Sequence, residues 1–142
     1  MDGKMPTLPE LRRKPADSEK ITINLGNVDL GQVDLLVHDG FYANRTDFIR
    51  TAIRNQLDRH GDAVRQSVAR QRLELGLRQF HRGELEAAVA AGEPLHIQVL
   101  GLAVIADDVD AELARAAIGS IHVLGALQAS APVKAALGDR IR

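Results

Sequence analysis

The sequence predicts an α+β protein with a strand and two helices first, then a helical linker and a small C-terminal β/α repeat domain. Residues Lys20–Leu25 alternate polar and apolar side chains, which is typical of a half-buried strand. Further on, Ile97–Gly101 returns as Ile121–Gly125, and a period of about 24 residues holding a strand and a helix is typical of parallel β/α units. The predicted parts are a flexible arm over residues 1–18, a strand-helix-helix domain over residues 19–60, a linker helix over residues 61–92 and the repeat domain over residues 93–142.

Composition and charge narrow the class of the protein. Hydrophobic residues make up 45% and charged residues 26% of the chain, as in an ordinary globular protein. There is no Cys, and no apolar run is long enough to cross a bilayer or to serve as a secretory signal, so we expect a cytoplasmic protein. Lys and Arg outnumber Asp and Glu in residues 1–83, and the reverse holds in residues 84–142. The first part of the chain is therefore the part suited to attract phosphate.

The strand predicted over Lys20–Leu25 needs a partner. Its alternation places Ile21, Ile23 and Leu25 on one face and Lys20, Thr22 and Asn24 on the other. No second strand of this kind follows nearby, and a lone strand leaves its backbone groups unpaired. Another copy of the chain is one candidate partner.

Two amphipathic helices are expected after the strand. The first runs from about Val28 to His38, and Gly40 suits the position after a helix end, where positive φ is needed. The second begins at Asn44, a good N-cap, with Asp47 three residues on as a short version of the capping-box acid. Its apolar face contains Phe48, Ile49, Ala52, Ile53 and Leu57.

The rest of the chain is predicted to be a linker helix and two β/α units. Asp62–Ala91 has the pattern of a helix, although its apolar stripe drifts too much for a coiled coil. Each later unit consists of a strand, a turn (Asp107-Asp108 or Ala131-Pro132) and a short helix. Two such units bury little apolar surface alone, so we expect this part to associate with other copies.

The alternating strand, the first helix, the turn at Gly40 and the run Phe41–Ile53, which reads FYANRTDFIRTAI, follow one another in order. This arrangement resembles the ribbon-helix-helix family, the fold of the CopG-like, Arc-like and MetJ-like repressors. The run Phe41–Ile53 in particular resembles one found in nickel-responsive and other CopG-like regulators. The resemblance covers residues 19–60 and leaves the C-terminal part unmatched.

The resemblance implies an intertwined homodimer that binds double-stranded DNA and regulates transcription, with repression as the expected effect. Two copies of the strand would form an antiparallel ribbon that enters the major groove, where Lys20, Thr22 and Asn24 would contact bases. The start of the second helix would contact phosphate through Asn44, Arg45 and Thr46. The shared dimer core would comprise Ile21, Ile23, Leu25, Val33, Val37, Phe48, Ile49 and Ile53.

Several alternatives remain at this point. Lys20–Leu25 could be an ordinary edge strand, and Arg45 could form an ion pair with Asp47 or Asp39. The C-terminal part could join dimers into tetramers or larger assemblies. A different protein with the same first half would be an antitoxin that wraps a toxin with its C-terminus, and a third candidate is an assembly protein that does not bind DNA.

Metal, cofactor and enzyme functions have little support in the sequence. If the repeated strands pair in parallel register, His96, Gln98, Ser120 and His122 share one sheet face, which makes His96 and His122 weak metal candidates. No dense histidine cluster accompanies them, so we expect neither metal nor cofactor. The chain has no phosphate-binding Gly loop, GxSxG, HExxH or CxxC motif, so we expect no enzyme.

Overall fold

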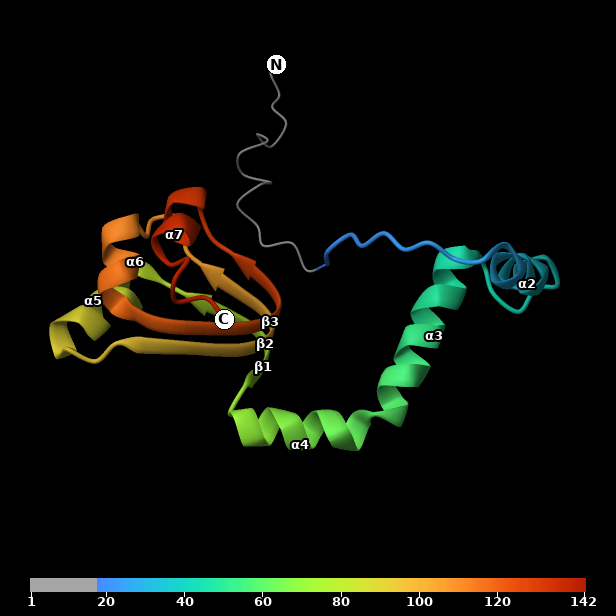
Figure 1. Cartoon of the computed structure of the whole chain (residues 1–142), viewed down its shortest axis with the longest axis horizontal. Coiled ribbons are helices and arrows are strands. Elements are labelled where there is room, and N and C mark those ends of the chain that lie inside the picture. Colours follow the sequence, from blue (N-terminus) through green and yellow to red (C-terminus); the bar gives the residue numbers. More distant parts are fainter. Residues whose placement is uncertain (1–17) are drawn as a thin grey trace, which may run out of the picture. The chain divides into compact units, whose positions relative to one another are not determined.

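A computed structural model describes residues 18–142, and these residues form two compact units (Figure 1). The N-terminal unit comprises Lys20–Arg70 and the C-terminal unit comprises Gln71–Arg142. The arm predicted over residues 1–18 lies outside the described residues except for Ser18, which is exposed. Helices and strands are both present, in agreement with the predicted α+β class.

The helices of the N-terminal unit begin and end at recognisable local signals. They are α2 (Asn27–His38), α3 (Arg45–Arg59) and α4 (Gly61–Gln71). After α2, Gly40 takes a φ of 87°, and the N–H groups of Gly40 and Phe41 donate to the carbonyls of Val37 and Leu36 at 3.1 and 2.9 Å. These two bonds form a Schellman motif, which glycine favours because it adopts positive φ without a steric penalty. The predicted helix end is confirmed.

Helices α3 and α4 meet at an angle rather than forming one rod (Figure 1). His60 caps α3 with a non-helical φ of −98° and ψ of 12°, and Gly61 begins α4 directly afterwards. The His60 N–H donates to the carbonyl of Leu57 at 3.1 Å, while the His60 carbonyl accepts from Val64 at 2.9 Å. The chain therefore turns at His60 with few backbone hydrogen bonds lost.

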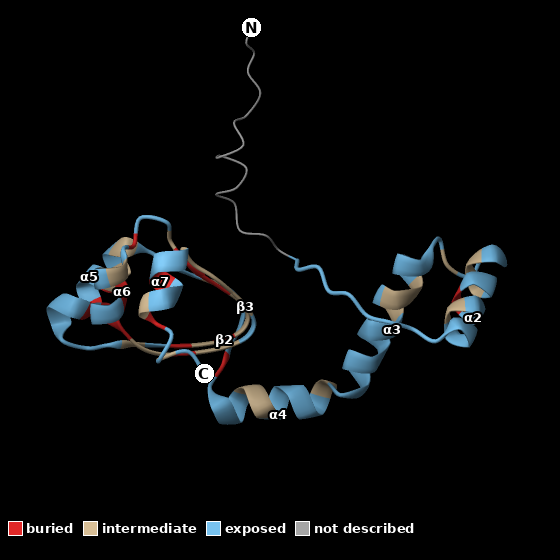
Figure 2. Ribbon diagram, turned by 45° about the horizontal axis from the view of Figure 1, so that its top comes forward, coloured by how far each residue is buried: buried red, intermediate tan, exposed pale blue. Residues whose placement is uncertain are grey.

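The C-terminal unit is a three-stranded parallel sheet with its helices over one face (Figure 2). The strand order is β1-β2-β3, the order in which the strands occur along the chain. Each strand is followed by a helix, as expected for β/α units. The elements are β1 (Glu74–Phe80), α5 (Arg82–Ala91), β2 (Leu95–Ile105), α6 (Ala111–Ala117), β3 (Ile118–Gln128) and α7 (Ala131–Ala136).

The structure differs from the single linker helix predicted over residues 61–92. That segment contains α4, β1 and α5, so the sheet unit begins near Gln71 and holds three β/α units instead of two. The spacing of Leu73, Leu77 and Phe80 fits a helical face, but Leu73, Leu75 and Leu77 also alternate as in a strand. Parallel pairing of Glu74–Phe80 with Val99–Ile105 decides between the two patterns.

Glycines at the same position of each strand explain the repeat in the sequence. Gly76, Gly101 and Gly125 lie in register, with φ values of 120°, 137° and 122°. A Cβ atom on Gly101 would collide with the carbonyl oxygen of Gly76, and one on Gly125 would collide with that of Gly101. Gly101 and Gly125 thus leave no room for a larger residue, whereas Gly76 has open space and shares only their positive φ.

The main core lies between the sheet and its helices. Ile97, Val99 and Ile105 on β2 and Ile121 on β3 are almost completely buried. They pack in one cluster with residues of all three helices: Leu85, Ala88, Ala114, Ala117, Val133 and Leu137, the last lying directly after α7. Helices α6 and α7 begin at side-chain caps, where Asp110 accepts from the Leu113 N–H at 2.8 Å and Ser130 from the Val133 N–H at 3.4 Å.

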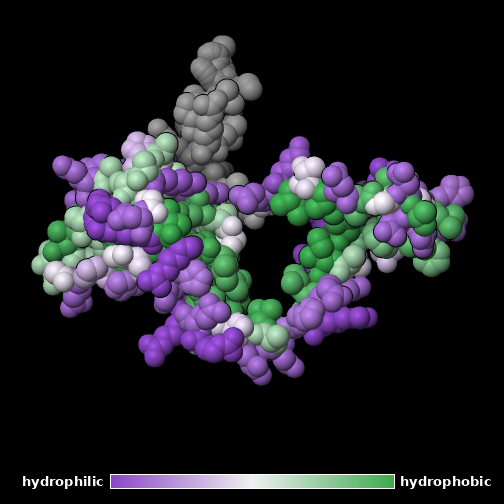
Figure 3. Space-filling view, in the orientation of Figure 1, coloured by the Kyte–Doolittle hydropathy of each residue, from purple (hydrophilic) through white to green (hydrophobic). Residues whose placement is uncertain are grey.

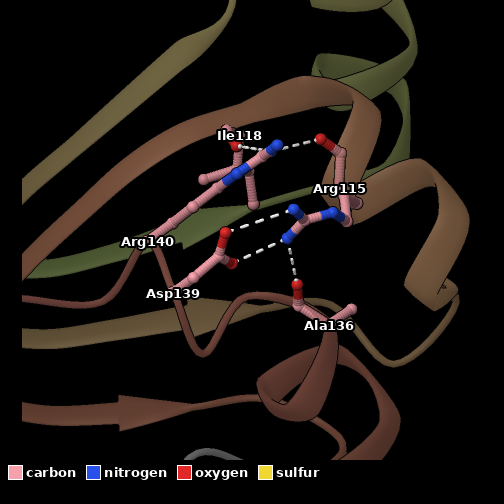
Figure 4. A network of polar contacts seen from close by, with 5 residues as sticks. All are labelled: Arg115, Ile118, Ala136, Asp139 and Arg140. Atoms are coloured by element: carbon pink, nitrogen blue, oxygen red, sulfur yellow. Dashed lines mark hydrogen bonds and ion pairs between the residues drawn. The ribbon is translucent and has the colours of Figure 1, made fainter.

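The end of the chain is fixed along the outer edge of β3 (Figure 4). Ile121 and Ile141 form a parallel bridge, through an Ile121 N–H to Arg140 carbonyl bond and an Arg142 N–H to Ile121 carbonyl bond, both 2.9 Å. Two arginines hold this segment. Arg115 contacts both Asp139 carboxylate oxygens, at 2.7 and 3.2 Å, and Arg140 donates to the carbonyls of Ile118 and Arg115.

Candidate functional site

The segment before α2 exposes a stripe of apolar side chains. In the single chain, Lys20–Leu25 belongs to no helix and pairs with no strand among the described residues (Figure 1). The side chains of Ile21 and Ile23 are 74% and 60% exposed, and Leu25 is exposed as well. Large β-branched residues that alternate along an extended segment are typical of a strand with one buried face. This segment therefore presents an apolar face that the described part of its own chain leaves uncovered.

Helices α2 and α3 form an incomplete core. Val33 is the only buried residue in the helices of this unit that the structure describes, and Val37, Phe48 and Ile49 are half-buried. Ile53 is exposed, and hydrophobic residues gather along one side of α3 (Figure 3). A groove of about 310 Å³ lies between the two helices, lined by Asp29, Gln32, Val33, Leu36 and Phe48. An apolar groove beside an exposed apolar segment leaves room for a second chain to complete the core.

The polar residues of the first segment lie at the surface. Lys20, Thr22 and Asn24 are all exposed. In strand geometry they would lie opposite Ile21, Ile23 and Leu25, so burial of the apolar face would leave these three side chains directed outward. An ammonium group, a hydroxyl and a carboxamide together supply both hydrogen-bond donors and acceptors.

The start of α3 is held by two side-chain capping hydrogen bonds. Asn44 Oδ1 accepts from the Asp47 N–H at 2.8 Å, and Asp47 Oδ2 accepts from the Ala43 N–H at 2.9 Å. The predicted N-cap is therefore confirmed. The first N–H groups of a helix have no acceptor within the helix, so those of Arg45 and Thr46 are available to a phosphate oxygen.

Arg45 forms an ion pair across the two helices with a partner that sequence reasoning missed. Its Nε and Nη2 atoms donate to Oδ1 and Oδ2 of Asp34 at 2.7 and 2.8 Å. The hydrogen bonds from Arg45 hold the pKa of Asp34 below its ordinary value, and Asp34 raises the pKa of Arg45. The sequence suggested Asp47 or Asp39 as partners, because both lie nearer along the chain. Nothing local identifies a carboxylate on the preceding helix.

An aromatic contact supports the turn between α2 and α3. The rings of Tyr42 and Phe48 meet edge to face, with centroids 5.0 Å apart. This geometry is favourable for aromatic pairs. It fixes the entry of the chain into α3, and with it the position of the N–H groups at Arg45 and Thr46.

The histidines of the sheet lie where the parallel register predicts. His96 pairs with Ser120 and Gln98 with His122 across β2 and β3. His96 Nδ1 lies 2.8 Å from Ser120 Oγ, so one ring nitrogen already has a hydrogen-bond partner. The described residues contain no group of three or more His, Cys, Asp or Glu side chains that could hold a metal ion.

Comparison with known families identifies a match that covers most of the chain. The model of the ribbon-helix-helix transcriptional regulator family matches residues 16–134, which includes the first segment, all three helices of the N-terminal unit and most of the sheet unit. Comparison with curated proteins and with solved structures gives no match. Within the described residues, no helix has both the length and the apolar character needed to cross a membrane.

Proposed function

The chain belongs to the ribbon-helix-helix transcriptional regulator family, and from this premise we propose that it represses transcription as a homodimer that reads the major groove of DNA. The observation that carries the proposal is the uncovered apolar stripe of Ile21, Ile23 and Leu25 beside the incomplete core of α2 and α3. A second copy would supply both missing parts. Its strand would satisfy the backbone of the first, and the paired strands would cover the helices.

In this dimer the two-fold axis would double the base-reading set. Lys20, Thr22 and Asn24 would extend from the outer face of the ribbon, and a two-stranded ribbon fits the major groove. Asn can bond adenine through two atoms, Lys can donate to guanine acceptors, and Thr can contact the thymine methyl. Three side chains from each subunit give a short recognition sequence in each half-site.

Phosphate contacts would fix the register of the ribbon on DNA. The Asn44 cap positions the free N–H groups at the start of α3, where the helix dipole also favours an anion. Arg45 can contact a phosphate only if its guanidinium shares or breaks its two hydrogen bonds with Asp34. We therefore assign positioning to the backbone N–H groups and Thr46 first, and to Arg45 second.

A gel-shift series tests the base-reading proposal. Sequences bound by the full-length protein are first selected from random DNA at fixed salt. Thr22→Ala and Asn24→Ala are then expected to lose about 1–3 kcal/mol each on the selected site and to keep their non-specific affinity. A matched control is Thr51→Ala, a half-buried threonine on α3 outside the ribbon. Unchanged affinity and sequence preference in both ribbon variants would favour an assembly protein that does not bind DNA specifically.

The C-terminal unit is proposed to associate with other copies of the chain. The alternative, an antitoxin tail that folds on its toxin, predicts rapid proteolysis after Ala91. The unit instead has a contiguous buried core that spans three β/α units. Limited proteolysis that leaves residues 71–142 intact while it cuts elsewhere would support a folded association domain.

A further inference from the structure

One face of the parallel sheet carries an apolar surface that no helix of the unit covers. Side chains alternate along a strand, so the burial of Ile97, Val99 and Ile105 against the helices places Leu100 and Leu102 on the opposite side. The register sets Leu75 and Leu124 beside Leu100. We call this surface the open face, and it consists of Leu75, Leu77, Leu100, Leu102, Leu124 and Ala126.

The open face is partly exposed and carries no Asp, Glu, Lys or Arg side chain. Leu75 is 71% exposed, and Leu77 and Leu124 are exposed as well. In the space-filling view, hydrophobic residues gather on the side of the C-terminal unit where the strands lie (Figure 3). The neighbouring positions of the same face are occupied by Gln79, Gln98 and Gln128 and, toward the starts of β2 and β3, by His96, Ser120 and His122. Sheet edges commonly carry charged residues that prevent association, and the edge strand β1 does so with Glu74 and Arg78, whereas the open face carries no Asp, Glu, Lys or Arg.

A parallel sheet with one bare face is unusual. Sheets of this kind occur almost only with both faces covered, and their strands then have nearly continuous apolar sequences. The stretch Val99–Ile105 of β2 fits that description, since it contains no polar side chain. The helices of the unit cover one face of the sheet, so the apolar sequence of β2 indicates that another part of a protein packs on the other face.

We infer that the open face packs against the open face of a second copy of the chain around a two-fold axis. A neutral apolar surface is complementary to itself, and two-fold pairing uses the same patch on both subunits. The inference rests on the proposed homodimer, because that dimer supplies the second copy. Only two residues, Arg72 and Leu73, separate α4 from β1. A linker this short keeps the two sheet units of a dimer at high effective concentration.

The other way to bury apolar surface, by adding strands to the sheet, is blocked at one edge. Continued stacking of β/α units would place β1 of one copy beside β3 of the next. The bridge between Ile121 and Ile141 occupies the first part of that edge, and the ion pair of Arg115 with Asp139 holds the bridging segment in place. Face-to-face pairing therefore gives a closed assembly, whereas edge stacking would need the chain end to detach.

Cysteine cross-linking of the full-length chain tests the inference. The sequence contains no Cys, so one introduced thiol reports on one position. Leu100→Cys places it on the middle strand of the open face, and Ala116→Cys places it on an exposed position of α6. With a short bismaleimide, Leu100→Cys is expected to give covalent dimers and Ala116→Cys to give none or few. Equal yields would overturn the inference.

A charge on the open face provides a second measurement. Leu124→Lys is tolerated by one unit because this side chain is already 47% exposed, and Val89→Lys on α5 is a matched control at 45%. Leu124→Lys in the Leu100→Cys background is expected to abolish cross-linking, whereas Val89→Lys should leave it intact. Circular dichroism verifies that both variants stay folded. Cross-linking that survives Leu124→Lys would contradict face-to-face pairing.

The same samples separate this inference from the proposed function. Loss of specific DNA binding in Asn24→Ala with cross-linking unchanged leaves the pairing of the sheets intact. Wild-type DNA binding combined with no cross-linking at Leu100→Cys would overturn the pairing and keep the DNA-binding proposal. If the N-terminal unit of the same chain covers the open face, no covalent dimer forms, and the inference also fails.

Discussion

At the scale of single residues, two positions show how much of this chain depends on contacts far along the sequence. Gly101 lies between the carbonyl of Gly76 and the next glycine of the ladder, and its φ of 137° lies in a region that L side chains rarely adopt. Asp34 joins α2 to α3 through the guanidinium of Arg45. Neither role is visible in the local sequence around these residues.

Replacement of Gly101 by Ala is expected to destabilise the C-terminal unit by at least about 2 kcal/mol, from backbone strain combined with the collision at the Gly76 carbonyl. Gly83→Ala is the matched control. Gly83 lies in α5, and a Cβ there would meet no atom within 4 Å. The control should gain roughly 0.5–1 kcal/mol from helix propensity. Urea unfolding measures the free energy of unfolding of both variants, and equal values for the two would show that the strand ladder does not require glycine at position 101.

The ion pair with Asp34 restrains the guanidinium of Arg45 at the start of α3. Asp34→Asn is expected to free the guanidinium of Arg45, and DNA affinity should then rise. The slope of log K against log salt should become steeper by the amount that corresponds to about one additional phosphate contact. Asp58→Asn removes the same charge near the other end of α3 and should change the slope little. Binding titrations between about 50 and 200 mM salt measure this difference in slope. An unchanged slope for Asp34→Asn would exclude Arg45 from phosphate contact.

At the scale of elements, the junction of β1 and α5 is held by one arginine. Arg78 donates to Glu84 Oε2 at 2.6 Å, contacts Glu74 at 3.3 Å, and its guanidinium lies 4.3 Å from the centre of the Phe80 ring. These contacts connect the edge strand of the sheet to the helix that follows it. Since β1 has a neighbouring strand on one side only, this network fixes its position in the described unit.

The network gives the C-terminal unit a defined acid sensitivity. The hydrogen bond from Arg78 holds the pKa of Glu84 below its ordinary value of 4.5. The unfolded chain therefore binds this proton more readily, so the contribution of Glu84 is present above that value and is lost as the pH falls through the folded pKa. Glu84→Gln should be less stable than the wild type at pH 7, and the two should converge in acid.

Thermal unfolding from pH 7 downward checks this expectation. Glu86→Gln, on the same helix, removes one carboxylate from the more exposed pair with Arg82 and serves as the control. A difference between wild type and Glu84→Gln that stays constant over the whole pH range would contradict the proposed role of the ionised carboxylate.

At the scale of the whole molecule, the two units differ in how complete they are as single chains. The C-terminal unit has a contiguous core of its own, whereas the described N-terminal unit buries only Val33. A dimer through the first segment would therefore contribute most of the stability of the N-terminal unit and comparatively little to the core of the sheet unit. Folding and dimer formation should be coupled most strongly in the first unit.

Ile23→Ala is expected to cost about 2 kcal/mol or more per subunit, because the side chain would be buried in the dimer although it is 60% exposed in one chain. The melting temperature of the N-terminal unit should rise with protein concentration, and the variant should shift it downward. Thr22→Ala, on the opposite face of the same segment, should leave it unchanged. A melting temperature independent of concentration would exclude the ribbon as the dimer interface.

The sequence by itself determined the elements whose signals are local. The Asn44 cap and the glycine after α2 each depend on residues within a few positions of one another, and the repeated strands carry the same Leu-Gly pair. The strand indicated by the alternation of Lys20–Leu25 stays a prediction, because that segment pairs with no strand in the described part of the single chain. Hydrogen bonds of helix ends and the alternation of side chains along a strand operate over that short range. The family resemblance over residues 19–60 rests on the same local features.

Only the tertiary structure decided that the segment after α4 is a strand and that Arg45 pairs with Asp34. Glu74–Phe80 fits both a helical and an alternating pattern, and it becomes a strand because its backbone pairs with Val99–Ile105. That pairing joins residues 25 positions apart in sequence, as Gly76 and Gly101 illustrate. Propensity is a weak preference of a fraction of a kcal/mol to about 1 kcal/mol per residue, and a complete set of strand hydrogen bonds over a buried core outweighs it.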